Sequence, residues 1–225
     1  MDGYLLVDKP EGISSFGVVG RLRRIIREAT GQKIKIGHTG TLDPLANGLL
    51  ILVIGKYTKR AAEFSKLDKV YEAELTLGLV SSTGDREGNL TQKSVQEPTK
   101  AQIERILNTF TGEIMQTPPS YSAIKVDGQR AYKLARAGKQ VKLEPRKARI
   151  HSLQLDSYNY PHLNLLTEVS SGTYIRSLAE DIGDALGTGA YLSALRRKKV
   201  GTYDVSEALK LDEIDYDLLL RKVKS

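Results

Sequence analysis

Two stretches of alternating apolar and polar residues constrain the fold of this chain more than any other feature. Lys147–Tyr158 and Leu163–Ser170 alternate with a period of two and lie only four residues apart, which predicts an antiparallel pair of strands. Val70–Leu79 alternates in the same way. Helical stretches fall between the strands without the regular strand–helix repeat of a doubly wound sheet. The pattern therefore predicts an α+β fold.

Helical periodicity marks several other segments. Ser14 or Ser15 can cap a helix that runs to about Thr30, with Gly31 as its stop. Thr99-Lys100-Ala101-Gln102 is a capping box that begins a second helix. The apolar residues of the first helix are predicted to share one side: Phe16, Val19, Leu22, Ile25 and Ile26. Further helices are expected over 58–67, 130–137, 174–186, 190–198 and 211–223.

Length and composition narrow the class of protein. The chain has 225 residues without an internal repeat or linker, which predicts a single domain over 1–225. A net charge of +7 favours a polyanionic partner such as nucleic acid. The lack of cysteine and the scattering of the three histidines predict no metal site. No signal peptide or membrane helix is evident, so we expect a cytoplasmic protein and no membrane partner.

Asp43 is the residue that the sequence singles out for chemistry. It lies within Gly37–Leu50, a stretch rich in glycine and hydroxyl side chains, and Pro44 favours an extended backbone at Asp43. Asn47-Gly48 is a turn signal before the buried strand expected over Leu49–Ile54. An acid on a shaped loop backed by a rigid strand is a usual arrangement for a catalytic group. An acid that merely closes a turn is an equally good interpretation of this stretch alone.

Other common catalytic motifs are absent. Gly55-Lys56-Tyr57 lacks the hydroxyl residue of a phosphate loop, no serine sits in a nucleophile elbow, and no second acid occupies a comparable loop as a glycosidase would need. A single carboxylate can act as a nucleophile if it stays ionised. A nearby arginine favours that charged form, and Arg176, near the start of a predicted helix, is one candidate.

Four motifs, spread over nearly the whole chain, occur in the order typical of one known family: Leu6–Pro10 with Gly12 and Ser14-Ser15, Gly37–Leu49, Lys69–Tyr71, and Ser171–Leu178. The segments 118–125 and 195–197 also match. On these residues the chain resembles the TruB family of tRNA pseudouridine synthases.

The resemblance implies isomerisation of the uridine at position 55 in the tRNA T loop, without cofactor or metal. It implies a curved, mixed, mainly antiparallel sheet with flanking helices and a central cleft. Asp43 would be the catalytic nucleophile, Tyr71 would pack on the target base, and Arg176 would pair with Asp43. His38 would fill the space left by the flipped-out nucleotide, and Leu195 would help to wall the pocket. The further substrate-binding residues expected are Tyr174, Lys9, Gly40, Lys125 and Arg136.

The segment around Lys125–Lys147 resembles the thumb that closes on the RNA in this family. Its basic residues suit RNA phosphates: Lys125, Arg130, Lys133, Arg136, Lys139 and Lys142. Many family members carry a C-terminal RNA-binding domain of the PUA type, which we do not expect here because the chain ends at Ser225. We expect a monomer that binds the T arm of tRNA. The basic residues Arg21–Arg27 and Arg196–Lys199 are either further RNA contacts or solvated helix surface.

Two alternatives to a tRNA isomerase stay open. One is a non-catalytic protein that binds tRNA or assists its folding, against which the intact set of Asp43, Tyr71 and Arg176 argues. The other is the relative that works with a guide RNA inside a particle, against which the short chain without basic tails argues. The sequence also leaves open whether Asp43 attacks the sugar C1′, assists loss of the 2′ proton, or adds to the pyrimidine ring.

Overall fold

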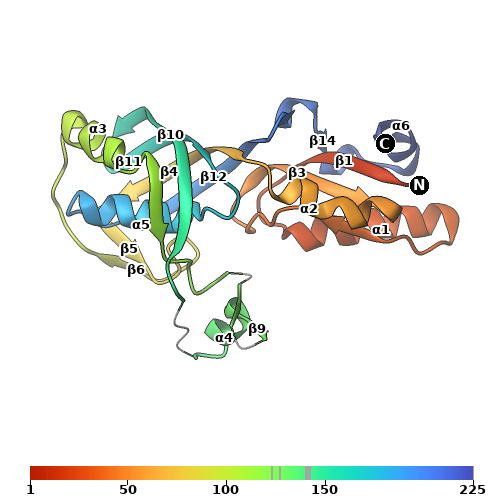
Figure 1. The fold of residues 1–225 in the computed structure, drawn as a ribbon, viewed down its shortest axis with the longest axis horizontal. Coiled ribbons are helices and arrows are strands. Elements are labelled where there is room, and N and C mark those ends of the chain that lie inside the picture. Colours follow the sequence, from red (N-terminus) through yellow and green to blue (C-terminus); the bar gives the residue numbers. More distant parts are fainter. Residues whose placement is uncertain (123, 127, 140–142, 225) are drawn as a thin grey trace. The chain divides into compact units, whose positions relative to one another are not determined.

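The chain is an α+β protein in which helices flank a large, mainly antiparallel sheet (Figure 1). A computed structural model describes residues 1–122, 124–126, 128–139 and 143–224. The chain divides into two compact units. Unit 1 comprises Met1–Tyr71 and Leu195–Ser225, and unit 2 comprises Glu72–Ala194. The α+β fold predicted from the alternating stretches is thus confirmed.

Unit 1 is built around β3 (Asn47–Ile54), whose two edges are both paired. On one edge, β1 (Gly3–Lys9) runs antiparallel to it. The other edge pairs with β2 (Ile36–His38) near the end of β3 and with β12 (Ala190–Val200) near its start. The short strands β13 (Tyr203–Asp204) and β14 (Leu209–Lys210) extend the sheet beside β12 and β1.

Both faces of β3 are buried, in two separate apolar clusters. Leu50 and Leu52 belong to the cluster that includes α1 (Ser15–Thr30) and Leu219 of α6 (Tyr216–Lys222). Leu49 and Ile51 belong to the cluster that includes Phe64 of α2 (Ala61–Ser65). A strand covered on both faces is a continuous apolar run rather than an alternating one. This explains why the sequence predicted a buried strand here.

Helix α1 begins and ends where the sequence predicts, but its buried face differs. The Ser14 side chain accepts from the Gly17 backbone N–H, and Gly31 adopts the left-handed conformation with a φ of 70°. The residues that face the core are Ser15, Val18, Val19, Leu22 and Ile26. Phe16 is 64% exposed, so its placement on the buried side was wrong. A helix turns by 100° per residue, and Ser15 occupies the inward direction instead.

The predicted helix over 190–198 is also wrong, because this segment is the strand β12. Ala, Leu, Arg and Lys all favour helices, but Arg196 and Arg197 pair with Asn47 and Gly48 of β3. Sheet pairing with a distant strand overrides the local preference. The helix predicted over 211–223 is divided into a 3₁₀ turn (Leu211–Glu213) and α6, and that over 58–67 into a 3₁₀ segment (Gly55–Arg60) and α2.

Unit 2 contains the strand pair that the alternation predicted. β10 (Arg146–Asn159) and β11 (His162–Val169) are antiparallel, and Leu155 lies opposite Leu165. β7 (Gly112–Gln116) pairs with the other edge of β10, and β4 (Lys69–Leu77), which begins in unit 1, lies next to β11. The helices of this unit are α3 (Lys100–Thr109), α4 (Ala131–Arg136) and α5 (Ile175–Ala185).

The remaining strands of unit 2 are short: β5 (Leu79–Ser81) pairs with β6 (Leu90–Gln92), and β8 (Lys125–Val126) with β9 (Gln129–Arg130). Both hydrogen bonds of the capping box predicted at Thr99 and Gln102 are present. The thumb residue Lys142 and the side chain of Arg136 lie outside the described residues. Among those residues, no helix combines the length and the apolar character needed to cross a membrane.

Candidate active site

The backbone on both sides of Asp43 is held by hydrogen bonds from distant parts of unit 1. The buried Ser15 hydroxyl donates to the Leu42 carbonyl at 2.9 Å and accepts from the Leu42 N–H at 2.8 Å. The Gly12 N–H donates to the Pro44 carbonyl at 2.8 Å. Asp43 itself closes a turn, because its carbonyl accepts from the Ala46 N–H at 3.1 Å. The acid therefore lies on a loop that is fixed at the residue before it and the residue after it.

A buried arginine from another strand also holds the loop that carries Asp43. Arg197 of β12 is 2% exposed, and its guanidinium donates to the carbonyls of Leu49 at 2.7 Å and Gly40 at 3.0 Å. Gly48 has a φ of +101°, and a Cβ there would lie 2.3 Å from the Arg197 carbonyl oxygen. Only glycine therefore permits β12 to approach β3 so closely. Arg197 is a supporting residue that sequence reasoning assigned to a solvated helix end or an RNA contact.

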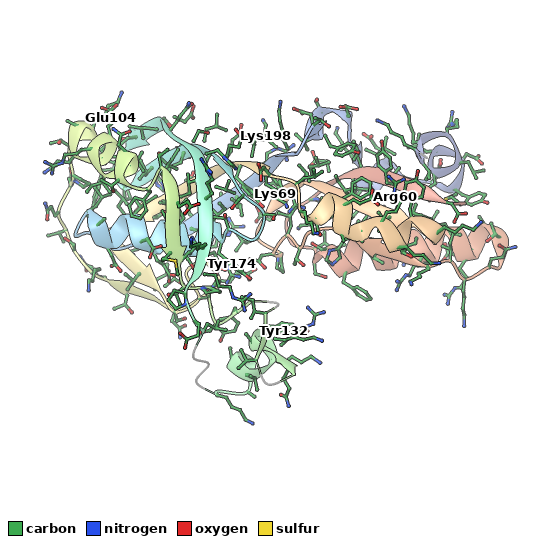
Figure 2. The ribbon with its side chains drawn as sticks, viewed as in Figure 1. Arg60, Lys69, Glu104, Tyr132, Tyr174 and Lys198 are labelled. Atoms are coloured by element: carbon green, nitrogen blue, oxygen red, sulfur yellow. The ribbon has the colours of Figure 1, made fainter. Side chains whose placement is uncertain are left out.

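Two buried lysines add positive charge to this region. The fully buried Lys9 donates from Nζ to the carbonyls of Pro10 at 2.9 Å and Ile13 at 2.7 Å. Burial lowers its pKa from 10.5 to about 8, although attraction to Asp43 opposes this shift. Burial likewise lowers the pKa of Lys69 (Figure 2) to about 8, and the charge of Arg197 adds to that shift. Lys9, which we expected among the substrate-binding residues, thus directs its ammonium group into the protein.

The other predicted site residues of unit 1 lie on β2, β4 and β12 and in the loop before Asp43. His38 ends β2 and Gly40 lies in the loop before Asp43, both half-buried. Tyr71 is the third residue of β4 and is 7% exposed. Leu195 is half-buried on β12 rather than on a helix. Binding of the substrate by these four residues stays a prediction.

The Arg196 side chain has a structural role in unit 1. Its guanidinium donates to both carboxylate oxygens of Asp8, at 3.2 and 2.8 Å, and to Asn47 Oδ1 at 2.8 Å. Lys199 forms an ion pair with Asp204 at 3.3 Å. The Arg196–Lys199 run is therefore not a solvated helix end. It is part of a strand whose two arginines make hydrogen bonds within the protein.

In unit 2, the side chain of Arg176, near the start of α5, is held by contacts with three other residues. It is 7% exposed, and Nη1 lies 3.5 Å from Asp85 Oδ2. Nη1 also donates to the Thr83 carbonyl at 3.2 Å, and Nη2 to the Tyr121 carbonyl at 2.7 Å. These contacts orient the guanidinium on three acceptors of unit 2. The pairing of Arg176 with Asp43 stays a prediction.

Asp85 is the supporting residue of this region that sequence reasoning missed. It is 3% exposed and accepts from the Thr83 hydroxyl at 2.6 Å and from the Glu87 N–H at 3.0 Å. The second bond, from a backbone two residues on, is an Asx turn. The polar stretch Asp85-Arg86-Glu87 predicts a solvated loop, and nothing local distinguishes a buried acid there. Its burial becomes evident only from the sheet bridge between Asp85 and Leu192.

The start of α5 is fixed by the buried side-chain amide of Gln116. The Gln116 side chain accepts from the Tyr174 N–H at 2.7 Å and donates to the Tyr174 carbonyl at 3.0 Å (Figure 2). The Ser177 hydroxyl donates to the Thr117 carbonyl at 2.8 Å. Tyr174 is thus the half-buried N-cap of α5. Its contact with substrate stays a prediction.

An acidic group follows Arg176 on the same helix. Burial raises the pKa of Glu180 to about 7, with Asp181, Asp184 and Asp85 raising it further and Arg176 opposing them. A Cβ on Gly84 would lie 3.0 Å from Glu180 Oε1. Glu180 therefore packs against the loop that carries Asp85.

Backbone hydrogen bonds hold the first part of the predicted thumb. The N–H groups of Ala131 and Tyr132 donate to the carbonyls of Ile124 at 2.7 Å and Ser122 at 3.0 Å. Lys125 on β8 is exposed, as are Arg130 and Lys139. These side chains are available to phosphates, and RNA binding by the thumb stays a prediction. Nowhere in the described part of the chain is a group of three or more His, Cys, Asp or Glu side chains placed to hold a metal ion.

Comparisons with known proteins identify the family. Residues 24–175 match the TruB family pseudouridylate synthase N-terminal domain, and residues 176–223 match the tRNA pseudouridylate synthase B C-terminal domain. The chain is 45% identical to the tRNA pseudouridine synthase B of Azoarcus sp., over 96% of this chain and 70% of that protein. It is 40% identical to the protein of the same name from Endomicrobium trichonymphae, over 99% and 96% of the two chains.

A solved structure with a similar fold is the Cbf5-Nop10-Gar1 complex, with a TM-score of 0.75 and 27% identity. The match covers 98% of this chain and 56% of that one. Two family models that together cover most of the sequence, and relatives that match nearly all of it, agree with the motifs around Asp43 and Arg176. This chain belongs to the TruB family of pseudouridylate synthases.

Proposed function

We propose that the chain isomerises the uridine at position 55 in the T loop of tRNA, with Asp43 as the nucleophile on a flipped-out nucleotide. The chain is a TruB-type pseudouridine synthase, as its family and its relatives named tRNA pseudouridine synthase B support. The T-loop position and the role of Asp43 are the proposal. Both come from the resemblance of the Gly37–Leu49 motif.

The observation that best supports Asp43 is how its loop is held. Ser15 makes two hydrogen bonds to the residue before Asp43, and Arg197 reaches the same loop through Gly40. Catalytic groups need their reacting atoms held close to the productive geometry, because a displacement of about 1 Å costs roughly a hundredfold in rate. An acid that only closed a turn would not need buried partners from a helix and from a distant strand.

The reaction itself needs only what a carboxylate and a pocket can supply. Uridine and pseudouridine are isomers: the bond from C1′ to N1 breaks, a bond from C1′ to C5 forms, and the proton on C5 is replaced by one on N1. No oxidant, reductant or co-substrate enters this balance. Asp43 can attack C1′, assist loss of the 2′ proton, or add to the ring, and these three routes remain open.

The target base must leave the stack before Asp43 can reach it. Tyr71 would pack on the extruded base, His38 would fill its place in the RNA, and Leu195 would line the pocket. The basic thumb would bind backbone phosphates. The protein is proposed to act as a cytoplasmic monomer without cofactor, its affinity resting on the T arm.

The alternative of a guide-RNA-dependent synthase is supported by one structural similarity. The Cbf5 chain belongs to a complex with Nop10 and Gar1, and its fold is similar. Its identity to this chain is 27%, against 45% for the tRNA pseudouridine synthase B of Azoarcus sp.. The higher identity favours a synthase that acts on tRNA without a guide.

The test is incubation of the pure protein with an unmodified tRNA transcript, followed by mapping of pseudouridine. We expect one modified position, the T-loop uridine, in the absence of any guide RNA. A transcript whose T-loop uridine is replaced by cytidine is the control and should stay unmodified. Modification elsewhere, or only after addition of a guide RNA, would contradict the proposed substrate position.

A further inference from the structure

The outer face of α1 carries an exposed aromatic side chain that the core does not use. The chain has eleven tyrosines, three phenylalanines and no tryptophan. Among the described residues, Phe16 is the most exposed aromatic side chain, with 64% of its surface open to solvent. A single exposed apolar residue is common on protein surfaces. The contacts around Phe16 give this one a more specific meaning.

The Arg23 guanidinium contacts both the Phe16 ring and the backbone of β2. The Arg23 guanidinium carbon lies 5.5 Å from the ring centroid, within the range of a cation–π interaction. Arg23 Nη2 also donates to the Ile36 carbonyl at 2.6 Å. Ile36 begins β2, the strand that ends at His38. The ring is thus tied to the strand that leads into the Asp43 loop while most of its surface stays open.

The position of Phe16 relative to that loop is set by its neighbour in the chain. Ser15 points inward and holds both backbone polar groups of Leu42, the residue before Asp43. Phe16 is the next residue, about 3.8 Å along the backbone, and points outward. The exposed ring therefore belongs to the helix turn that holds the residue before Asp43.

Along the next three turns of α1, the same face changes from the aromatic ring to the open position Gly20 and then to basic side chains. A Cβ added at Gly20 would meet nothing within 4 Å. Glycine inside a helix costs about 0.5 to 1 kcal/mol relative to alanine, and packing does not require it here. Arg24 and Arg27 follow, both exposed. Arg24 has only a weak pairing with Glu28, 4.0 Å away, because both side chains are more than half exposed.

We propose that this face of α1, defined by Phe16, Gly20, Arg24 and Arg27, binds a single-stranded part of the substrate RNA. An unpaired base stacks on the Phe16 ring, the nucleotide backbone passes over Gly20, and the two arginines contact phosphates. The inference rests on the proposed function in that the RNA is the one whose uridine reaches Asp43. Helix α1 contains four arginines and one glutamate, which suits a polyanion and would repel a second copy of the same surface.

The test uses Phe16→Trp, which introduces the chain's one tryptophan. Its fluorescence should be quenched when an unmodified T-arm hairpin binds, and a fully paired duplex of the same stem should quench it much less. Leu220→Trp is the matched control, because Leu220 is a 55% exposed residue on α6 of the same unit. Its fluorescence should not respond to the hairpin. Binding is followed independently by the anisotropy of labelled RNA.

Affinity gives the second measurement. Phe16→Ala should weaken hairpin binding roughly 5- to 100-fold, the range for losing one base–aromatic stack, while Phe16→Tyr stays close to wild type. Arg24→Ala and Arg27→Ala should each reduce the salt slope by about 0.7 to 0.9. All four variants should keep the wild-type melting temperature, because the residues are exposed.

The outcomes distinguish an error in the proposed RNA-binding surface from an error in the proposed function. If the hairpin is bound and isomerised but Phe16→Trp shows no quenching and Phe16→Ala binds like wild type, the surface is wrong and the function stands. If Phe16→Trp is quenched by the hairpin but wild type does not isomerise it, the surface stands and the function is wrong. If no RNA binds, both are wrong.

Discussion

The Asp43 loop in unit 1 and the start of α5 in unit 2 each present a charged side chain, and the hydrogen bonds described around them differ in kind. In the Asp43 loop, the Ser15 hydroxyl bonds to the backbone of Leu42 and the Arg197 guanidinium bonds to the backbone of Gly40. Around Arg176 they go to the side chain itself, through Asp85 and two backbone carbonyls.

The difference follows from what each group can donate and accept. A nucleophilic carboxylate must offer its oxygens to the substrate, so the protein orients it best by fixing the backbone beside it. A guanidinium has five N–H donors in a fixed fork. It can use several of them on protein acceptors and still present others to a ligand. The comparison predicts that mutations near Asp43 act through the backbone geometry of its loop, and that mutations near Arg176 act through the contacts of its side chain.

The largest effect is expected at Asp43. Asp43→Asn keeps the shape of the side chain but removes the nucleophilic charge, so single-turnover isomerisation of a tRNA transcript should fall at least about a thousandfold. The affinity for tRNA should stay within about tenfold, because phosphate contacts dominate binding. Turnover near wild type in Asp43→Asn would sink the assignment of the nucleophile.

The next effect is expected at the buried ion pair of unit 2. Asp85→Asn leaves Arg176 without its carboxylate partner, which should lower the free energy of unfolding by roughly 3 to 5 kcal/mol. Arg176→Lys keeps the charge but not the planar fork, so kcat should fall about a hundredfold. Urea unfolding and steady-state kinetics measure the two effects. Full kcat in Arg176→Lys would show that charge alone suffices there.

A pair of adjacent serines tests whether geometry governs the Asp43 loop. Ser15→Ala leaves the buried N–H and carbonyl of Leu42 without their partner, which should cost about 1 to 3 kcal/mol of stability. It should also lower kcat roughly 10- to 100-fold at unchanged tRNA affinity.

Ser14→Ala is the matched control for that change. Ser14 caps α1 through the Gly17 N–H at 3.0 Å, so its loss should cost about 1 kcal/mol of stability and leave kcat unchanged. Equal losses of kcat in the two variants would mean that the start of α1 matters, and not the bond to Leu42.

The smallest effect is a pH dependence of stability in unit 2. Burial and the nearby Asp181, Asp184 and Asp85 raise the pKa of Glu180 from 4.5 to about 7, against the attraction of Arg176. Between these two values the folded state binds more protons than the unfolded state, so stability falls as pH rises. Glu180→Gln removes this loss and should be more stable than wild type at pH 8 but not at pH 4.5.

Urea unfolding at several pH values measures that difference. Glu104→Gln is the control, because Glu104 (Figure 2) is an exposed residue whose contact with Lys100 spans 3.8 Å. It should shift stability by less than about 1 kcal/mol at any pH. A wild type and a Glu180→Gln variant with parallel pH profiles would rule out a raised pKa at Glu180.

Local and near-local patterns determined a large part of this protein. The period-two alternation was enough to predict β10 and β11 as an antiparallel pair. The serine and glycine signals were enough for both ends of α1, and the Thr99–Gln102 box for α3. The order of motifs along the chain was enough for the TruB family. These signals act over a few residues, or through the order of short motifs along the chain, and need no knowledge of which distant segments meet.

The tertiary structure alone decided what depends on distant segments meeting. The sequence preference of 190–198 is helical, but pairing with β3 makes it a strand and buries Arg197 beneath the Asp43 loop. Phe16 fits an apolar helix face by composition, but Ser15 takes the inward position because Leu42 needs its hydroxyl. Asp85 looks like a solvated loop acid until Arg176 is placed beside it. In each case a hydrogen bond or ion pair with a residue at least 27 positions away outweighs the local preference, because a buried polar group without a partner costs more free energy than a helix propensity provides.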